Sequence, residues 1–526
     1  MGDAQSQHTE LVLNNRVFFD IMQATELLGG YSLALTALSA LSFVVFTVLL
    51  KRYLHLRHIP GPFLASLTDL WLTHKFWSGE GFGQITSDLH HKYGPVVRMG
   101  PNRLIFSHAS AIPVIYRTTD VMPKSSFYLP LRVMLRGREI SSFVSVLDEK
   151  RMSAIKRLLL GNFTINSFLR QEPELDHTIS SLVKYLEDTG KGIEIGKTFG
   201  YWAFDSISRI ALSEDQAFLS QQKDFGDTLE GAYRRLAHWH DWGALPTLER
   251  LIFKNPLMQI FQTSSTLGTL AAQRMQTRLK QEKETDLESQ VDLLGKYLAA
   301  SRRDPNLIKP ADVIGFLVST MHAGSETTGQ AVAGVLSVLL RHPEKMAKLE
   351  EEILSADLGD MPKFEDANKL PYLDSVIREF GRFRRGGMSL LERTVPRDGA
   401  TIDGIWVPGG TNVSVSTACV NLDPAIWGPN PEQFVPERWI GISEEKFKLM
   451  DHADLTFSVG RRMCIGRNLA MIEMKKALAR LIRTFEISPT DPNDDLEPDI
   501  QAGNRPFYNS KLNFVRREKV KEKVEA

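Results

Sequence analysis

The sequence predicts a mainly α-helical protein with a smaller β-rich lobe, preceded by one N-terminal transmembrane helix. Three observations indicate this: helical periodicity dominates as far as about Arg384, strand and turn patterns occur near residues 93–106 and 394–416, and residues 27–50 carry no charge. A chain of 526 residues with 43% apolar residues can bury a large core. We therefore expect one large lobe or two smaller ones.

The uncharged run at residues 27–50 is the first predicted element. As a helix it would be about 36 Å long, which is enough to cross a bilayer. Acidic residues dominate before it, whereas Lys51, Arg52 and Arg57 follow it directly, so the rest of the chain is expected on the cytosolic side. A cleaved signal peptide is the alternative, but the run is long and lies behind 26 residues with more acids than bases. The prediction is a short lumenal N-terminus at 1–26 and an anchor at 27–50.

The soluble part follows a Pro/Gly-containing hinge at 51–65, where Pro60 and Pro62 disfavour helix. A hairpin is expected between residues 93 and 106, and Asp403-Gly404 is expected to form a later turn. Residues 517–526 are nearly all charged and form a tail. Basic and acidic residues balance at 63 each, which argues against a nucleic-acid partner.

The most informative stretch runs from Phe457 to Gly466 and contains Cys464, one of only two cysteines. Adjacent arginines favour a thiolate, the form that binds metal, and glycines let main-chain N–H groups approach the sulfur. The stretch resembles the heme-binding signature of the cytochrome P450 family, Phe-x-x-Gly-x-Arg-x-Cys-x-Gly, at every fixed position. The resemblance implies heme b (iron protoporphyrin IX) as cofactor, Cys464 as axial iron ligand, and Phe457 and Gly460 as part of the cofactor-binding loop. The alternative for Cys464 is a buried thiol in a turn; the other cysteine, Cys419, has the neighbours of a core residue.

A second motif interrupts an apolar helix expected from about Ala311 to Arg341. Gly324, Glu326 and Thr327 place polar groups within little more than one turn, and such groups need a reason. The family resemblance implies that Glu326 and Thr327 are the catalytic acid and alcohol pair over the heme, which relays protons to bound oxygen. The alternative is a threonine bonded to a helix carbonyl and a glutamate facing solvent. Gly324 would favour a local kink.

A third motif combines an acid and an arginine three residues apart, Glu379 and Arg382, with Arg438 further along the chain. Such pairs are common on exposed helices and carry little weight alone. Their positions resemble the family's Glu-x-x-Arg helix and its Pro-Glu-Arg partner loop. The resemblance implies a buried charge network whose role is structural.

The resemblance also implies three cations for the heme propionates, namely Arg462, Arg393 and Lys156. Members of the family often carry Trp or His four residues before the third cation, whereas this chain has Met152. Arg157 is therefore an alternative, and Lys156 is equally compatible with a solvated helix charge.

Other aromatic and polar segments are harder to assign. His238 and His240 are two residues apart and do not share a helix face, so we expect a surface rather than a metal site there, with Trp239 and Trp242 beside them. By position, the substrate pocket is expected to be bordered by residues 127–134, Phe316, Met321 and residues 386–390.

The resemblance covers residues from Ile59 to about Arg516, so residues 66–516 are expected to be the catalytic domain. A softer similarity, around Lys92 to Arg98, is to fungal microsomal members of the pisatin demethylase kind. It implies an endoplasmic reticulum monooxygenase that inserts one oxygen atom from O2 into a mid-sized lipophilic metabolite by hydroxylation, epoxidation or O-dealkylation, in secondary metabolism or detoxification.

The electron source should be external, because the chain carries no nicotinamide or flavin fingerprint. The resemblance implies NADPH-cytochrome P450 reductase as partner, with a cytochrome of the b-type as a further donor. Two alternatives remain open: a heme-thiolate isomerase or dehydratase that uses no external O2, and a non-catalytic heme-binding membrane protein.

Overall fold

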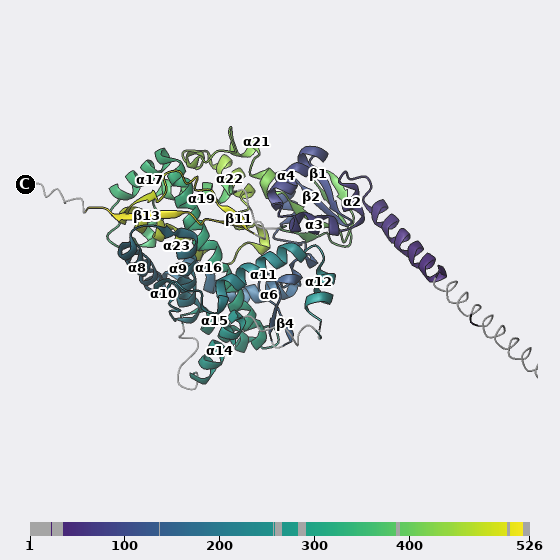
Figure 1. Ribbon diagram of the computed structural model, residues 1–526, viewed down its shortest axis with the longest axis horizontal. Coiled ribbons are helices and arrows are strands. Elements are labelled where there is room, and N and C mark those ends of the chain that lie inside the picture. The colour runs from purple at the N-terminus through teal and green to yellow at the C-terminus, as the bar shows by residue number, and fades with distance from the viewer. Residues whose placement is uncertain are drawn as a thin grey trace, which may run out of the picture.

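The computed structural model describes residues 23, 35–135, 137–255, 257, 266–281, 291–384, 390–501 and 505–518. It consists of a large helical lobe and a smaller β-rich lobe, so the predicted fold class is confirmed (Figure 1). The helices of the body are α2 Phe63–Leu67, α3 Leu70–Trp77, α4 Phe82–Tyr93, α5 Ile112–Ile115, α6 Glu149–Leu159, α7 Ile165–Leu169, α8 Glu172–Thr189, α9 Ile195–Leu212, α10 Phe218–Gln221, α11 Thr228–Trp242, α12 Pro246–Phe253, α14 Thr266–Gln281, α15 Leu293–Arg303, α16 Pro310–Arg341, α17 Pro343–Ser355, α18 Phe364–Ala367, α19 Pro371–Phe383, α20 Thr417–Val420, α21 Pro424–Trp427, α22 Glu444–Ala453 and α23 Arg467–Thr484.

The strands form a four-stranded sheet in the order β1-β2-β9-β6, a three-stranded sheet β10-β13-β5, and three two-stranded ribbons. Strands β1 and β2 are antiparallel, which confirms the expected hairpin, and β9 pairs parallel to β2. The β7–β8 hairpin turns at Asp403 and Gly404, both with positive φ, as predicted for that dipeptide. The strands are β1 Val96–Gly100, β2 Arg103–Phe106, β3 Val133–Leu135, β4 Arg138–Ile140, β5 Ile193–Glu194, β6 Arg393–Thr394, β7 Ala400–Ile402, β8 Ile405–Val407, β9 Asn412–Val415, β10 Phe485–Pro489, β11 Asp499–Gln501, β12 Arg505–Phe507 and β13 Lys511–Arg516.

Helix α16 runs through the centre of the helical lobe (Figure 1). Its residues are apolar on most of its circumference, and a helix of that kind is stable only when buried. It packs against α9, α14, α15 and α23. Gly329 permits the close contact with α9, because a Cβ at this position would lie 2.6 Å from the Phe199 carbonyl oxygen.

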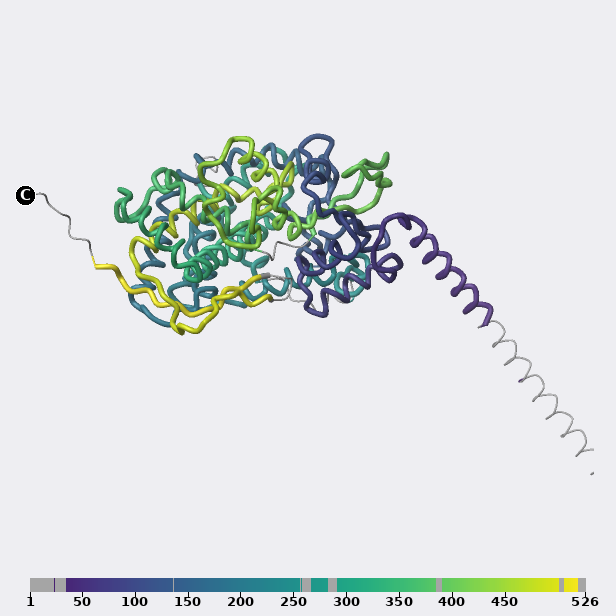
Figure 2. The backbone as a smooth tube through the Cα atoms, turned by 90° about the horizontal axis from the view of Figure 1, so that it is seen from above, coloured from purple at the N-terminus to yellow at the C-terminus, as the bar shows by residue number. Residues whose placement is uncertain are grey.

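An exposed apolar helix, Leu35–His55, projects from the β-rich lobe, and β13 lies at the opposite end of the molecule (Figure 2). By length and composition this helix could cross a membrane; within the described residues it is the one helix that qualifies. Residues 27–34 of the expected anchor lie outside the described part. The helix continues through Lys51 to His55, so regular structure persists into the expected hinge, because lysine and arginine are good helix formers.

The junction between this helix and the body is fixed by Arg98, a buried residue of β1. Its guanidinium donates to the carbonyls of Arg52 and Tyr53 at the end of the helix, and also to the Ser66 and Pro101 carbonyls. These bonds satisfy carbonyls that a helix C-terminus leaves without partners. The segment expected to act as a hinge is therefore held against the sheet.

Candidate functional site

The cysteine loop lies between a 3₁₀ turn, Gly460–Arg462, and the start of α23. The Cys464 N–H donates to the Phe457 carbonyl (2.8 Å), which closes the loop, and the Phe457 ring lies under the Arg467 guanidinium. Gly460 has a φ of 69°, and a Cβ there would lie 1.7 Å from the Tyr116 carbonyl oxygen. Position 460 therefore requires glycine, because any side chain there would clash with the backbone that follows α5.

The thiol of Cys464 is accessible, although protein surrounds it on most sides. The desolvation raises the pKa of the thiol, while the main-chain N–H groups of Gly466 and Arg467 and the charge of Lys156 act in the opposite direction. These groups favour the thiolate and are the kind of contacts that tune a bound metal. The arrangement does not match the alternative of a thiol packed in a turn, because such a side chain would be buried.

One short stripe of the central helix α16 is exposed. Ala323 and Thr327, one turn apart, are the exposed positions, and the other residues of the helix from Asp312 to Leu339 are buried or half-buried. The Thr327 hydroxyl donates to the Ala323 carbonyl (2.7 Å), as in the threonine half of the alternative considered above. Glu326, by contrast, is buried and does not face solvent.

Gly324 does not interrupt the helix. Helix α16 is assigned without a break from Pro310 to Arg341, so the expected kink is not seen in its hydrogen bonding. Gly324 instead admits the side chain of Ile207 from α9, because a Cβ would lie 2.5 Å from that side chain.

Arg462 and Lys156 lie on the two sides of the cysteine loop. Arg462 is buried; its Nε and Nη2 bond to the carboxylate of Glu149 at the start of α6, whereas its Nη1 is buried without a hydrogen-bond partner. The Lys156 Nζ donates to the Arg461 carbonyl (2.6 Å). Desolvation, and then the charge of Arg462, lower the pKa of Lys156 to about 8. Arg157 is exposed, so Lys156 is the cation of α6 that contacts the loop.

A fourth cation, Lys124, is a neighbour of Arg393, because the backbones of the two residues form an isolated β-bridge. Arg393 is buried in β6 over the Tyr116 ring, and it donates to the Glu392 carbonyl (3.0 Å). Lys124 was not expected from the sequence; its Nζ donates to the Val144 carbonyl (2.8 Å). Burial lowers the pKa of Lys124 well below its ordinary value, and the charges of Arg393, Arg462 and Lys156 lower it further.

This cluster of Lys124, Lys156, Arg393 and Arg462, which we call the cation cluster, fits the two propionates of a heme. Neighbouring positive charges lower the pKa values of Lys124 and Lys156, and the buried Arg462 Nη1 has no acceptor among the described residues, which together indicate a site for an anion. The accessible thiol of Cys464 supplies the soft ligand that iron takes in heme-thiolate proteins.

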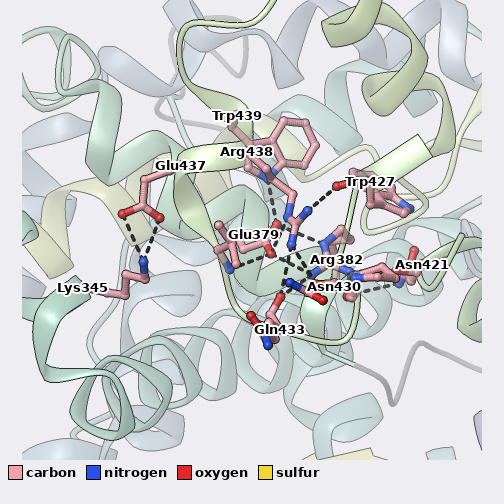
Figure 3. A network of polar contacts seen from close by, with 12 residues as sticks. Lys345, Glu379, Arg382, Asn421, Trp427, Asn430, Gln433, Glu437, Arg438 and Trp439 are labelled. Carbon is pink, nitrogen blue, oxygen red and sulfur yellow. Dashed lines mark hydrogen bonds and ion pairs between the residues drawn. The ribbon is translucent and has the colours of Figure 1, made fainter. Parts of the chain in front are cut away.

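The Glu379 network is closed, as Figure 3 shows. The Glu379 carboxylate accepts from Arg382 Nη2 (2.7 Å) and Arg438 Nε (2.9 Å), and also from the Trp439 indole and the Val435 N–H. The three charged side chains are at most 7% exposed. The structure thus brings together the three residues expected to form a structural network.

A further buried acid, Glu473 on α23, was not singled out in the sequence. Its carboxyl accepts from the Ser206 hydroxyl of α9 (2.7 Å) and contacts Thr328, the neighbour of Thr327. Burial raises the pKa of Glu473 to about 7. The stretch from Ala470 to Ile482 also carries Lys475, Lys476 and Arg480, so an acid there is not unusual and the local sequence gave no distinct signal for Glu473.

Several expectations about the surroundings need correction. Phe316 and Met321 are fully buried, and Phe316 stacks on Phe143, so neither borders the open stripe of α16. Trp239 and His240 are buried rather than on a surface; the Trp239 indole donates to the Phe127 carbonyl, and His240 packs on Phe76. In the part of the chain that the structure describes, no group of His, Cys, Asp and Glu could hold a metal ion by itself. Residues 386–389 of the expected pocket border lie outside the described residues.

The chain is similar to known proteins over most of its length. The family model described as cytochrome P450 matches residues 60–510. A cytochrome P450 monooxygenase of Aspergillus terreus is 32% identical over 85% of this chain and 93% of its own length. Cytochrome P450 monooxygenase cicH of Emericella nidulans is 30% identical over 90% of this chain and 96% of its own length. Cytochrome P450 monooxygenase mpaDE' of Penicillium brevicompactum is 28% identical over 88% of this chain, and the match covers 56% of that relative.

Proposed function

The chain belongs to the cytochrome P450 family and is a heme-dependent monooxygenase, and from this premise we propose that it hydroxylates, epoxidises or O-dealkylates a lipophilic secondary metabolite. The electrons come from NADPH through a separate reductase, with a cytochrome of the b-type as an optional donor. The observation that carries the proposal is the accessible Cys464 thiol beside the cation cluster. Residues 66–516 form the catalytic domain.

Four cations and one thiol would hold the heme. Cys464 would bind the heme iron, and the cation cluster would hold the propionates, which would give Arg462 Nη1 an acceptor. The main-chain N–H groups of Gly466 and Arg467 hold negative charge on the sulfur. When bound, the heme activates dioxygen; the protein supplies orientation, exclusion of water and protons.

Thr327 and Glu326 are the proposed proton-handling pair. The Thr327 hydroxyl proton is held on the Ala323 carbonyl, and rotation about χ1 would release it toward the exposed side of α16. Glu326, the adjacent buried acid, is the proposed source of the proton that replaces it. Burial of the flanking helix excludes bulk water, so proton delivery depends on these groups.

Membrane attachment is supported by two features at the same end of the molecule. The helix Leu35–His55 is exposed along its length, and α2, α3 and α12 near it carry exposed Phe63, Trp77 and Leu251 (Figure 1). Exposed apolar patches of this kind mark contact surfaces. We place the chain in the endoplasmic reticulum membrane, with residues 1–26 in the lumen, a single span that includes the anchor at 27–50, and the catalytic domain facing the cytosol.

The carbon monoxide difference spectrum of the dithionite-reduced protein tests the central assignment. The wild type should give the red-shifted Soret band of thiolate ligation. Cys464→Ser should lose that band, and the matched control Cys419→Ser should keep it, because Cys419 is half-buried away from the loop. A band at the position typical of histidine ligation in the wild type would reject the assignment. Equal consumption of NADPH and O2 with product would separate a monooxygenase from an isomerase or dehydratase.

A further inference from the structure

The guanidinium of Arg235 lies where three elements meet: its own helix α11, the central helix α16, and a 3₁₀ turn at Ser126–Leu131. Its Nη1 donates to the His322 Nδ1 (3.0 Å), and its Nη2 donates to the Leu131 carbonyl. Its Nε is out of contact with solvent and makes no hydrogen bond to any residue that the structure describes. An arginine carries five N–H donors, so this side chain has donors to spare in a desolvated place.

The acceptors of Arg235 are both neutral. His322 is a neutral imidazole at ordinary pH, because burial lowers its pKa well below the usual value and the charge of Arg235 lowers it further. Within the described residues, no carboxylate oxygen lies within the 4.0 Å of an ion pair with Arg235, and Glu326 acts on it only at longer range. Burial still lowers the pKa of Arg235 to about 10. Burying a cation without a counter-ion costs free energy, and an anion that binds to the cation would offset this cost.

The position of Arg235 connects it to the proposed active site. His322 immediately precedes the exposed Ala323 and lies one turn before Glu326 on α16. The guanidinium therefore lies on the side of α16 that carries His322 and Glu326, which adjoins the stripe of Ala323 and Thr327. The planar fork of arginine suits a carboxylate, which can accept from Nε–H and a remaining Nη hydrogen together.

We propose that Arg235 binds the carboxylate of an acidic lipophilic substrate and so selects acids over their neutral analogues. This inference rests on the proposed function, because it assigns the substrate class of that same site. His322 and the Leu131 carbonyl hold the guanidinium in place and act as positioning groups.

The test uses the full-length chain in detergent, with 4-hexylbenzoate and dodecanoate and their methyl esters as probes. Binding is measured by the Soret shift of the heme-loaded protein and, independently, by equilibrium dialysis of labelled probe. The wild type should bind at least one acid about tenfold or more tightly than its ester, the size of effect expected for a charge-assisted pair. Arg235→Gln should abolish this preference and leave ester binding unchanged.

The matched control is Arg234→Gln, which removes the neighbouring arginine of the same helix, whose side chain is 61% exposed. It should keep the preference for the acid. Three results would overturn the proposal: no acid preference in the wild type, a preference that survives in Arg235→Gln, or an equal loss of acid and ester, which would mean that Arg235 serves only packing or Glu326.

If Arg235→Gln does not fold, Arg235→Lys tests whether the preference for the acid depends on the guanidinium. It keeps the charge without the planar fork, so the preference should fall, and an undiminished preference contradicts the proposal. The carbon monoxide spectrum of the same samples separates the two hypotheses. A wild type without the thiolate band would reject the proposed function, whereas dialysis would still report whether Arg235 selects acids.

Discussion

Two charged clusters of this protein differ in how their charges are matched. The Glu379 network has one carboxylate between Arg382 and Arg438, and both arginines also bond to main-chain carbonyls, so every charge has close partners (Figure 3). The cation cluster holds four positive groups, and the one carboxylate that bonds to it directly, within the described residues, is Glu149. A closed network stabilises the protein, whereas an open one retains affinity for a missing anion.

The position of each cluster follows from its partners. Glu379 and Arg382 are held on one face of α19, and the 3₁₀ turn with Arg438 comes to them, so the network joins elements far apart in the chain. The members of the cation cluster come from α6, β6, the cysteine loop and the segment before residue 126, and all converge on the region of Cys464. The Glu379 network therefore holds distant elements of the fold together, whereas the cation cluster forms a binding site.

Removing the acid of the closed network should have the largest effect. Glu379→Ala leaves Arg382 and Arg438 buried without their carboxylate, and we expect a loss of about 3–5 kcal/mol in the free energy of unfolding. Denaturant unfolding followed by circular dichroism measures it. The control is Glu444→Ala, which removes an exposed acid paired with Lys448 and should cost about 1 kcal/mol or less. If the two variants lose the same free energy of unfolding, the Glu379 network stabilises the protein no more than an ordinary ion pair does.

Glu473 is a third kind of site, a buried acid with neutral partners and no cation in contact. Its pKa rises from 4.5 when unfolded to about 7 when folded, so between these pH values the folded state binds the additional proton. The stability contribution of Glu473 is present below pH 4.5 and is lost as the pH rises toward 7, by about 3 kcal/mol.

Glu473→Gln should remove this pH dependence, because the amide keeps bonds to Ser206 and Thr328 without titrating. Urea unfolding at pH 5 and pH 7 gives the comparison. The stability difference between variant and wild type should increase in favour of the variant toward pH 7. If the stability difference is the same at pH 5 and pH 7, folding does not change the protonation of Glu473.

The sequence was sufficient where a motif had a fixed spacing. The hairpins follow from turn residues such as Asp403 and Gly404, because local chemistry determines them. The family resemblance of short motifs predicted the contacts of Glu379 with Arg382 and Arg438, which the structure shows, and the ligand role of Cys464, which stays a prediction. The long apolar run of α16 was likewise sufficient to predict a buried helix.

The remaining features depend on contacts between distant segments. Lys124 belongs to the cation cluster only because its segment pairs with Arg393, almost 270 residues later, and nothing in the local sequence indicates that pairing. The same holds for Phe316, which has the apolar character of a pocket residue but packs on Phe143. His240 is buried because Phe76 of α3 covers it, a contact that the sequence of α11 does not reveal. Helical periodicity identifies a buried face but not what covers it.

Replacing Lys124 should sharpen the comparison with the smallest and most specific effect. Lys124→Met removes one of four like charges and keeps the apolar stem, so the heme-free protein should become more stable by about 1 kcal/mol, while heme affinity falls about tenfold. The first quantity is read from urea unfolding of the apoprotein and the second from heme transfer to an excess of an apoglobin. Lys150→Met, an exposed position on α6, is the control and should change neither quantity. The two expected effects have opposite signs, and this is what tests the role of Lys124. If Lys124→Met destabilises the heme-free protein as well, Lys124 stabilises the chain through the Val144 carbonyl, as the closed network does, and is not part of an anion site.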